Sequence, residues 1–270
     1  MKNPWHDRRV LITGASSGLG AALARELAQA GARLALAARR VELIERMASD
    51  FEPLGTEVRV HRCDLSQPGS ARTLVERAET ELGGLDVLIL NAGMVVEQLL
   101  TDSDEETARG MMETNFWSNY AAMQAVLPGM TRRGEGRICV VTSFCAYAHL
   151  PLSSAYSASK AALASLSLVL ANELPPGISV TLVYPGIIRT PMFEDVKTNV
   201  PVMGRLAWLG IEPETAARSI LKATARRKRR LYLTGAAKAV ALSMRIAPQW
   251  TDMAVKQIYR SLPKHWLDRS

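Results

Sequence analysis

The sequence predicts an α/β protein, a doubly wound parallel β-sheet with helices on both faces in three αβα layers. Two observations support this fold class. Short apolar runs alternate with longer helical patterns over the first two-thirds of the chain, which indicates parallel strand–helix–strand units with right-handed crossovers. The apolar runs also contain few polar residues, as expected for strands whose two faces are both covered by helices.

The bounds of the individual elements follow from the spacing of apolar residues. The strands are expected at Arg9–Thr13, Arg33–Ala37, Val58–His61, Val87–Leu90, Arg137–Thr142 and Ser179–Val183. The helices are expected at Leu19–Gln29, Val41–Phe51, Ser70–Leu82, Glu105–Met130 and Ser154–Glu173. Pro213 suits the first turn of a further helix, which leads into a short strand at Leu231–Thr234.

The C-terminal part of the chain predicts an extension of the same domain. Residues 235–270 are expected to form two helices, broken at Pro248. A chain of 270 residues is long enough to bury one large core. We therefore expect residues 1–270 to form a single domain that ends in a helical extension.

The composition is that of an ordinary globular protein, with 48% hydrophobic and 22% charged residues. No apolar run is long enough for a signal peptide or a spanning helix, so we expect a cytoplasmic protein. Cys63, Cys139 and Cys145 lack metal-ligand spacing, so we expect reduced thiols and no metal site. The net charge of +7 suits an anionic cofactor or substrate, nucleic acid or a membrane surface.

A glycine-rich turn joins the first expected strand to the first expected helix. It reads TGASSGLG and contains Gly14, Ser16, Ser17, Gly18, Leu19 and Gly20. Glycine lets the backbone turn sharply and approach a pyrophosphate, and the helix N-terminus offers that anion free N–H groups and a positive dipole end. A tight turn without a ligand would also use glycine, so the turn alone is a weak indicator.

The second expected strand ends in two arginines, Arg39 and Arg40, and carries no carboxylate at its end. NAD-binding sites often place an acidic residue there to hold the ribose hydroxyls. A carboxylate would repel the 2′-phosphate of NADP, whereas arginine can bind it through two hydrogen bonds. The sequence therefore favours NADP(H) over NAD, mainly through Arg39 with Arg40 as helper. The alternative is that both arginines are solvated residues at a helix start.

Tyr156 and Lys160 lie four residues apart on an expected helix, which places them on one face. A nearby ammonium lowers the pKa of a phenol, so that the phenol can act as a general acid or base nearer neutral pH. Ser143 follows a buried strand and could donate a hydrogen bond to a substrate oxygen. In isolation the tyrosine and lysine would more simply be a surface pair, and Ser143 a turn residue.

Together these residues resemble the short-chain dehydrogenase/reductase family. The matching positions keep the family's order from Thr13 to Thr190. They are the glycine turn, Asp64 and Leu65 after the third strand, Asn91, Ala92 and Gly93 after the fourth, Asn115, Ser143, Tyr156 and Lys160, and Pro185, Gly186, Ile188 and Thr190. The resemblance implies a Rossmann fold and an oxidoreductase that interconverts a carbonyl and a secondary alcohol.

The resemblance also implies a role for each catalytic residue. Tyr156 would exchange a proton with the substrate oxygen, and Lys160 would lower the pKa of Tyr156 and hold the nicotinamide ribose. Ser143 would orient the carbonyl and stabilise its developing negative charge. Asn115 would anchor a water that relays protons to Lys160.

Further roles concern the cofactor. Asp64 would accept a hydrogen bond from the adenine amino group, and Leu65 would add a backbone contact. Asn91, Ala92 and Gly93 would line the cofactor cleft. The segment from Pro185 and Gly186 would reach the carboxamide through Ile188 and Thr190.

The substrate side of the expected site is apolar. Phe144, Cys145 and Ala146 replace the small, often glycine-containing stretch that usually follows the family's serine, which predicts a bulkier and more apolar wall. We expect Ser143, Cys145 and Tyr156 to contact the substrate. The stretches Met94–Val96, Tyr147–Leu152 and Pro191–Trp208 are rich in apolar residues. Apolar pockets suit apolar ligands, so a lipid, steroid-like or acyl ketone is expected. The alternative is that these side chains pack in the core or at a subunit interface.

The surface suggests two kinds of partner. The resemblance implies a homodimer through the helices at Glu105–Met130 and Ser154–Glu173. The basic run Ala225–Arg230 and the apolar, aromatic tail with Trp250, Tyr259 and Trp266 suit a peripheral contact with a membrane surface. A solvated helix end, a subunit contact or pocket closure would explain the same residues. No base-reading or stacking pattern accompanies the cations, so nucleic acid is not expected.

Two other functions fit the same sequence. The basic surface could attract an acyl thioester on a carrier protein, which would make the chain a 3-oxoacyl thioester reductase, although the long tail and the bulky residues after Ser143 disfavour this. A non-catalytic NADP-sensing regulatory protein is the alternative from another class. The presence of both Tyr156 and Lys160 favours an enzyme.

Overall fold

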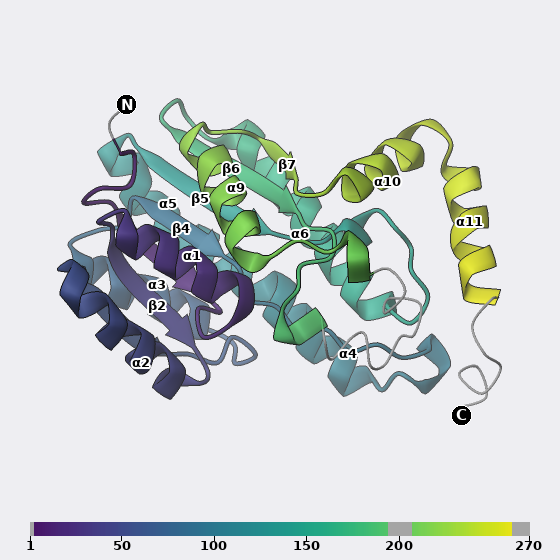
Figure 1. Cartoon of the computed structure of the whole chain (residues 1–270), viewed down its shortest axis with the longest axis horizontal. Coiled ribbons are helices and arrows are strands. Elements are labelled where there is room, and N and C mark those ends of the chain that lie inside the picture. The colour runs from purple at the N-terminus through teal and green to yellow at the C-terminus, as the bar shows by residue number, and fades with distance from the viewer. Residues whose placement is uncertain (1–2, 194–206, 261–270) are drawn as a thin grey trace.

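A seven-stranded parallel sheet organises the computed structural model, which describes residues 3–193 and 207–260 (Figure 1). The strands are β1 (Arg9–Thr13), β2 (Arg33–Ala38), β3 (Val58–Arg62), β4 (Val87–Leu90), β5 (Gly136–Val141), β6 (Ile178–Tyr184) and β7 (Arg230–Tyr232). Their order is β3-β2-β1-β4-β5-β6-β7, so the chain winds outward from β1 in one direction and then from β4 in the other. The predicted doubly wound sheet is confirmed.

Helices cover both faces of this sheet. They are α1 (Gly18–Gln29), α2 (Val41–Phe51), α3 (Ser70–Leu82), α4 (Glu105–Met112), α5 (Ser118–Arg133), α6 (Ser154–Glu173), α9 (Pro213–Ala225), α10 (Gly235–Ile246) and α11 (Pro248–Arg260). Short 3₁₀ turns occupy Glu52–Leu54, Leu100–Asp102, Phe144–Ala146 and Ala207–Leu209. Helices α1, α2 and α9 pack on one face, and α3, α5 and α6 on the other.

Successive side chains along each strand point to opposite faces of the sheet, so the core is divided into two layers. On β1, Val10 and Ile12 join the layer under α1, whereas Leu11 joins the layer under α3 and α5. All three side chains are fully buried, because successive residues of a strand point to opposite faces. This double burial is the physical reason for the apolar strand sequences.

The helix expected at Glu105–Met130 is instead interrupted. Helix α4 ends at Met112, a π-turn spans Glu113–Trp117, and α5 continues to Arg133. Side chains at the start of α5 bond to the carbonyls of the turn: the Ser118 hydroxyl donates to the Thr114 oxygen at 2.7 Å, and the Asn119 amide donates to the Asn115 oxygen at 2.8 Å. Single π-turns of this kind often occur at functional sites.

The C-terminal helices α10 and α11 extend away from the sheet (Figure 1). The strand expected at Leu231–Thr234 ends earlier, at Tyr232, because the Thr234 hydroxyl caps α10 by accepting a hydrogen bond from the Ala237 N–H at 3.1 Å. Helix α11 begins at Pro248, where the break was expected. Trp266 and the rest of residues 261–270 lie outside the described part of the chain. None of the described helices is both long and apolar enough to cross a membrane.

Candidate active site

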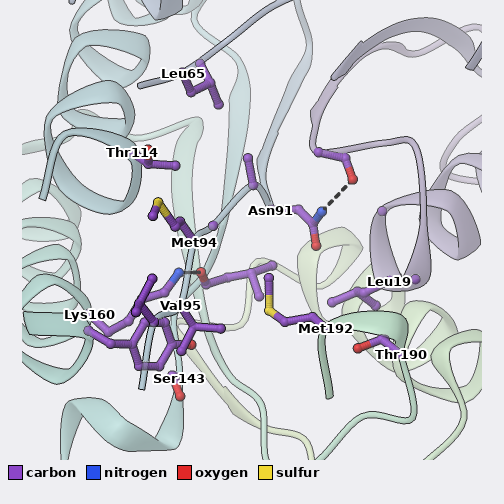
Figure 2. A pocket seen from close by; sticks show the side chains of 18 of the residues that line it. Leu19, Leu65, Asn91, Met94, Val95, Thr114, Ser143, Lys160, Thr190 and Met192 are labelled. Carbon is purple, nitrogen blue, oxygen red and sulfur yellow. Dashed lines mark hydrogen bonds between the residues drawn. The ribbon is translucent and has the colours of Figure 1, made fainter. Parts of the chain in front are cut away.

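One cleft lies along the carboxyl edge of the sheet, where the strand order reverses between β1 and β4 (Figure 2). Ligands of open α/β sheets bind at such a point. Its lining includes these predicted site residues: Gly14, Ser16, Ser17, Gly18, Leu19, Gly20, Arg39, Arg40, Asp64, Leu65, Asn91, Ala92, Gly93, Ser143, Cys145, Tyr156, Lys160, Pro185, Gly186, Ile188 and Thr190. Asn115 is fully buried behind the wall.

The glycine turn between β1 and α1 needs its glycines for steric reasons. Gly14 and Gly18 adopt φ values of +68° and +53°, which side-chain-bearing residues rarely adopt. A Cβ on Gly20 would collide with the carbonyl oxygen of Gly14. No side chain caps the start of α1 and its first turn has no acidic residue, so its N–H groups face the cleft as a positive end.

Asn91 fastens this turn to the end of β4. Its side-chain amide donates to the carbonyl oxygens of Thr13 and Gly14 at 3.1 and 3.2 Å. The Thr13 hydroxyl in turn accepts from the backbone N–H groups of Asn91 and Ala92, both at 3.1 Å. Figure 2 shows Asn91 reaching toward the turn. Asn91 therefore positions the turn in addition to lining the cleft.

Arg39 and Arg40 are exposed at the rim beyond β2. The Arg40 guanidinium donates to the Ser17 hydroxyl at 3.1 Å, so this arginine reaches the glycine turn. Asp64 also lines the cleft, and hydrogen bonds from the Ser66 N–H and hydroxyl, aided by the charge of Arg39, lower the pKa of its carboxyl group. The rim thus carries two cations, of which Arg40 contacts the glycine turn.

Ser143, Tyr156 and Lys160 meet at the ends of β5 and α6. The Lys160 ammonium lies 5.9 Å from the centre of the Tyr156 ring and donates to the Val141 oxygen at 3.3 Å. The Ser143 hydroxyl accepts from the Cys145 N–H at 3.1 Å. Ser143 and Lys160 are almost fully buried, at 7% and 3% exposed, and Tyr156 is half-buried.

Burial shifts the two titratable groups in opposite directions. It raises the pKa of Tyr156 well above its ordinary value, with smaller rises from Cys145 and Glu97, while the hydrogen bond to Ser143 opposes them. It lowers the pKa of Lys160 from 10.5 to about 8. The expected lowering of the tyrosine pKa by Lys160 is not the net result, because desolvation of the enclosed phenol dominates.

Asn115 sits in the π-turn and bonds to two other elements. Its side-chain oxygen accepts from the Met94 N–H at 2.8 Å, and its amide donates to the Met94 oxygen at 2.8 Å and the Ser159 hydroxyl at 3.0 Å. A Cβ on Gly93 would lie 3.2 Å from the Lys160 nitrogen and 3.4 Å from the Asn115 oxygen. Asn115 therefore holds the segment after β4 against α6, beside the lysine.

The loop after β6 closes the far side of the cleft. The Pro185 oxygen accepts from the Phe144 N–H at 3.1 Å, which ties this loop to the turn after Ser143. Thr190 approaches the start of α1, since a Cβ on Gly18 would lie 3.0 Å from its methyl group. The loop thus brings the predicted Ile188 and Thr190 opposite the glycine turn.

The substrate side of the cleft contains many apolar side chains. Its lining includes Met94, Val95, Val96, Phe144, Leu150, Met192 and Phe193, and residues 194–206 of the predicted stretch lie outside the described chain. Glu97 also lines it, and the sequence reasoning missed this residue. The available signal was a single charge directly after the apolar run Met94–Val96.

Comparison with known proteins identifies relatives. A family model described as short chain dehydrogenase matches residues 8–201. 11-beta-hydroxysteroid dehydrogenase 1A of Arabidopsis thaliana is 39% identical over 190 residues, which cover 69% of this chain and 54% of that protein. The chain therefore spans about half the length of that relative. Dehydrogenase/reductase SDR family member 7B of Danio rerio is 33% identical, with 88% of this chain and 81% of that protein covered.

Solved structures share the fold. A short-chain dehydrogenase/reductase from Burkholderia phymatum in complex with NAD superimposes with a TM-score of 0.83 at 22% identity, over 90% of this chain and 94% of that one. L-sorbose reductase from Gluconobacter frateurii, complexed with NADPH and L-sorbose, has a TM-score of 0.78 at 27% identity, over 87% and 98%.

Proposed function

The chain belongs to the short-chain dehydrogenase family, and on that premise we propose that it is an NADP(H)-dependent oxidoreductase that reduces an apolar ketone to a secondary alcohol. One observation carries the proposal. Ser143, Tyr156 and Lys160 converge in the cleft that also contains the glycine turn at the start of α1. A proton donor and an anion-binding turn in one cleft suit reduction of a carbonyl by a dinucleotide.

The cleft fits such a cofactor. The close approach of Gly14, Gly18 and Gly20 leaves backbone N–H groups accessible to a pyrophosphate. Arg39 and Arg40 offer cations to a 2′-phosphate, with Asp64 and Leu65 beside them for the adenine. Of the two solved relatives above, one is complexed with NAD and the other with NADPH, so the preference proposed for this chain rests on Arg39 and Arg40. When bound, the nicotinamide supplies the hydride.

The side chains of Tyr156 and Ser143 bind and protonate the carbonyl oxygen of the substrate. Tyr156 donates its proton to that oxygen, and the Ser143 hydroxyl holds the oxygen by a hydrogen bond. The phenol of Tyr156 is protonated at neutral pH and can donate this proton, and its raised pKa makes it a weaker acid than an exposed phenol. Lys160 binds the ribose, and Asn115 keeps the segment beside it in place.

The substrate is proposed from the lining of the cleft and from relatives. Met94, Val95 and Met192 present apolar side chains to the cleft (Figure 2), and Phe144 also lines it. Two of the relatives above are a hydroxysteroid dehydrogenase and a dehydrogenase/reductase. A steroid-like ketone with a large apolar frame therefore suits the pocket best.

The assembly is proposed as a cytoplasmic homodimer of one catalytic domain per chain, with residues 235–270 as its extension. Helices α5 and α6 leave Tyr120 and Val169 exposed, which suits subunit pairing through them. Analytical ultracentrifugation should give twice the chain mass of 29.5 kDa, and a monomer would contradict the pairing.

The catalytic proposal is tested with Tyr156→Phe and a panel of hydrophobic ketones. Oxidation of NADPH, followed by absorbance, should be fast in the natural protein and about a hundredfold to ten-thousandfold slower in the variant, because the acid is lost. NADPH binding, measured by calorimetry, should persist. Tyr120→Phe on α5 is the control and should keep full turnover. Normal turnover of Tyr156→Phe, or no turnover of any ketone by the natural protein, would contradict the proposal.

A further inference from the structure

Glu97 places a carboxyl group among apolar side chains on the substrate side of the cleft. It follows Met94, Val95 and Val96, which line the same space. One of its oxygens, Oε2, is inaccessible to solvent and accepts no hydrogen bond from the described residues, 3–193 and 207–260. A buried acceptor without a donor destabilises the free protein, and a ligand that supplies the donor removes this cost.

The backbone beside Glu97 is fixed to the loop that leads into α6. The Gln98 N–H donates to the Leu152 oxygen at 2.9 Å, and Gln98 forms a parallel bridge with Ser153. The Gln98 side chain donates to the Ser103 hydroxyl at 3.0 Å. Because Tyr156 lies on α6, these contacts fix the position of the Glu97 backbone relative to the proton donor.

Glu97 interacts electrostatically with residues near the reaction centre. Its carboxylate raises the pKa of both Cys145 and Tyr156, so its charge acts on the wall that faces the reacting oxygen. Lys160 lines the same cleft and donates to the Val141 oxygen. Burial raises the pKa of Glu97 itself to about 7, so that the carboxyl group titrates near neutral pH.

We propose that Glu97 determines specificity by accepting a hydrogen bond from a second polar group on the substrate, a hydroxyl, so that the enzyme prefers hydroxyl-bearing apolar ketones. This inference rests on the proposed reductase function. A neutral hydroxyl suits the site better than an ammonium, because Met94, Val95 and Val96 next to Glu97 are apolar and the chain carries a net charge of +7. The hydroxyl lies apart from the carbonyl that Ser143 and Tyr156 bind.

The test compares pairs of ketones with the same carbon frame, with and without one hydroxyl, across a set of hydroxyl positions. For one position or more, the natural protein should show a kcat/KM about ten- to a hundredfold higher for the hydroxy ketone. Glu97→Leu should abolish that ratio while the plain ketone is still reduced. Glu76→Leu removes an exposed carboxylate from α3, outside the cleft, and should leave the ratio unchanged.

A second variant, Glu97→Gln, preserves the size of the side chain but not its titration. In the natural protein the hydroxy-to-plain ratio should rise from pH 6 to pH 8, because the ionised carboxylate is the stronger acceptor. The ratio cancels the protonation of Tyr156 and Lys160, which both substrates need. The ratio of Glu97→Gln should not change with pH.

Different results would contradict the proposed role of Glu97 and the proposed reductase function. Reduction of both ketones with a ratio that Glu97→Leu leaves unchanged would overturn the role of Glu97 alone, as would a ratio near one at every hydroxyl position. Absence of NADPH oxidation with every ketone would instead overturn the reductase function.

Discussion

Lys160 is an ammonium in a dry environment, and its pKa of about 8 links catalysis to stability. The folded state binds this proton less readily than the unfolded chain, where the pKa is near 10.5. The charged side chain therefore destabilises the fold below about pH 8, and this cost disappears as the pH rises toward 10.5. The shift corresponds to roughly 3 kcal/mol at neutral pH.

We predict that Lys160→Met inactivates the enzyme but increases the free energy of unfolding at pH 7, with a smaller gain at pH 10. Urea denaturation at both pH values measures this. Lys238→Met, at an exposed site on α10, should change neither value. An equal gain at both pH values would show that the ammonium is not the cause.

Arg39 carries the preference between cofactors. We predict that the natural protein uses NADPH more efficiently than NADH, and that Arg39→Asp lowers kcat/KM for NADPH about ten- to a hundredfold, because a carboxylate would repel the 2′-phosphate. Steady-state rates with both cofactors test this. Arg46→Asp on the exposed face of α2 is the matched control. A natural preference for NADH would be incompatible with the assignment.

At the scale of elements, the sheet and most helices could be predicted, because strands covered on both faces must be apolar and helices must bury one stripe. In α2, Ile44, Met47 and Phe51 show that spacing and are buried. The π-turn could not be predicted, because one extra residue in a turn hardly changes the apolar spacing. Glu97 was missed for a related reason: neighbouring letters do not show which side chains face a cleft formed by distant loops.

The π-turn has a measurable consequence through Asn115. Asn115→Leu leaves the Met94 N–H and oxygen and the Ser159 hydroxyl without their partner. We predict a loss of about 2 kcal/mol in the free energy of unfolding, measured by urea denaturation, and a lower kcat because the segment beside Lys160 is no longer held. Asn172→Leu, which removes an exposed amide from α6, should retain both values. If Asn115→Leu kept the natural free energy of unfolding and the natural kcat, Asn115 would not have the positioning role proposed for it.

At the scale of the whole molecule, the extension formed by α10 and α11 stands apart from the sheet and exposes apolar residues (Figure 1). Ile246 is 73% and Trp250 63% exposed, and Leu242 and Met253 are also exposed. Lys238, Arg245 and Lys256 add cations to the same two helices. Such a surface suits the boundary of an anionic membrane.

We predict that the protein sediments with vesicles containing anionic lipid and less with neutral vesicles. Replacing both Ile246 and Trp250 with aspartate should abolish sedimentation. Leu54→Asp, an exposed leucine distant in sequence, should have no effect. A natural protein that stays in the supernatant with both kinds of vesicle would remove the membrane contact.

The position of β1 in the middle of the sheet has a consequence during synthesis. One edge of β1 pairs with β2, but the other pairs with β4, which begins only at Val87. On a ribosome that adds about 5–20 residues per second, that apolar edge waits roughly 4–15 seconds for its partner. An unpaired strand edge invites wrong pairing. The nascent chain should therefore be most prone to aggregation, and most dependent on chaperones, before its fourth strand emerges.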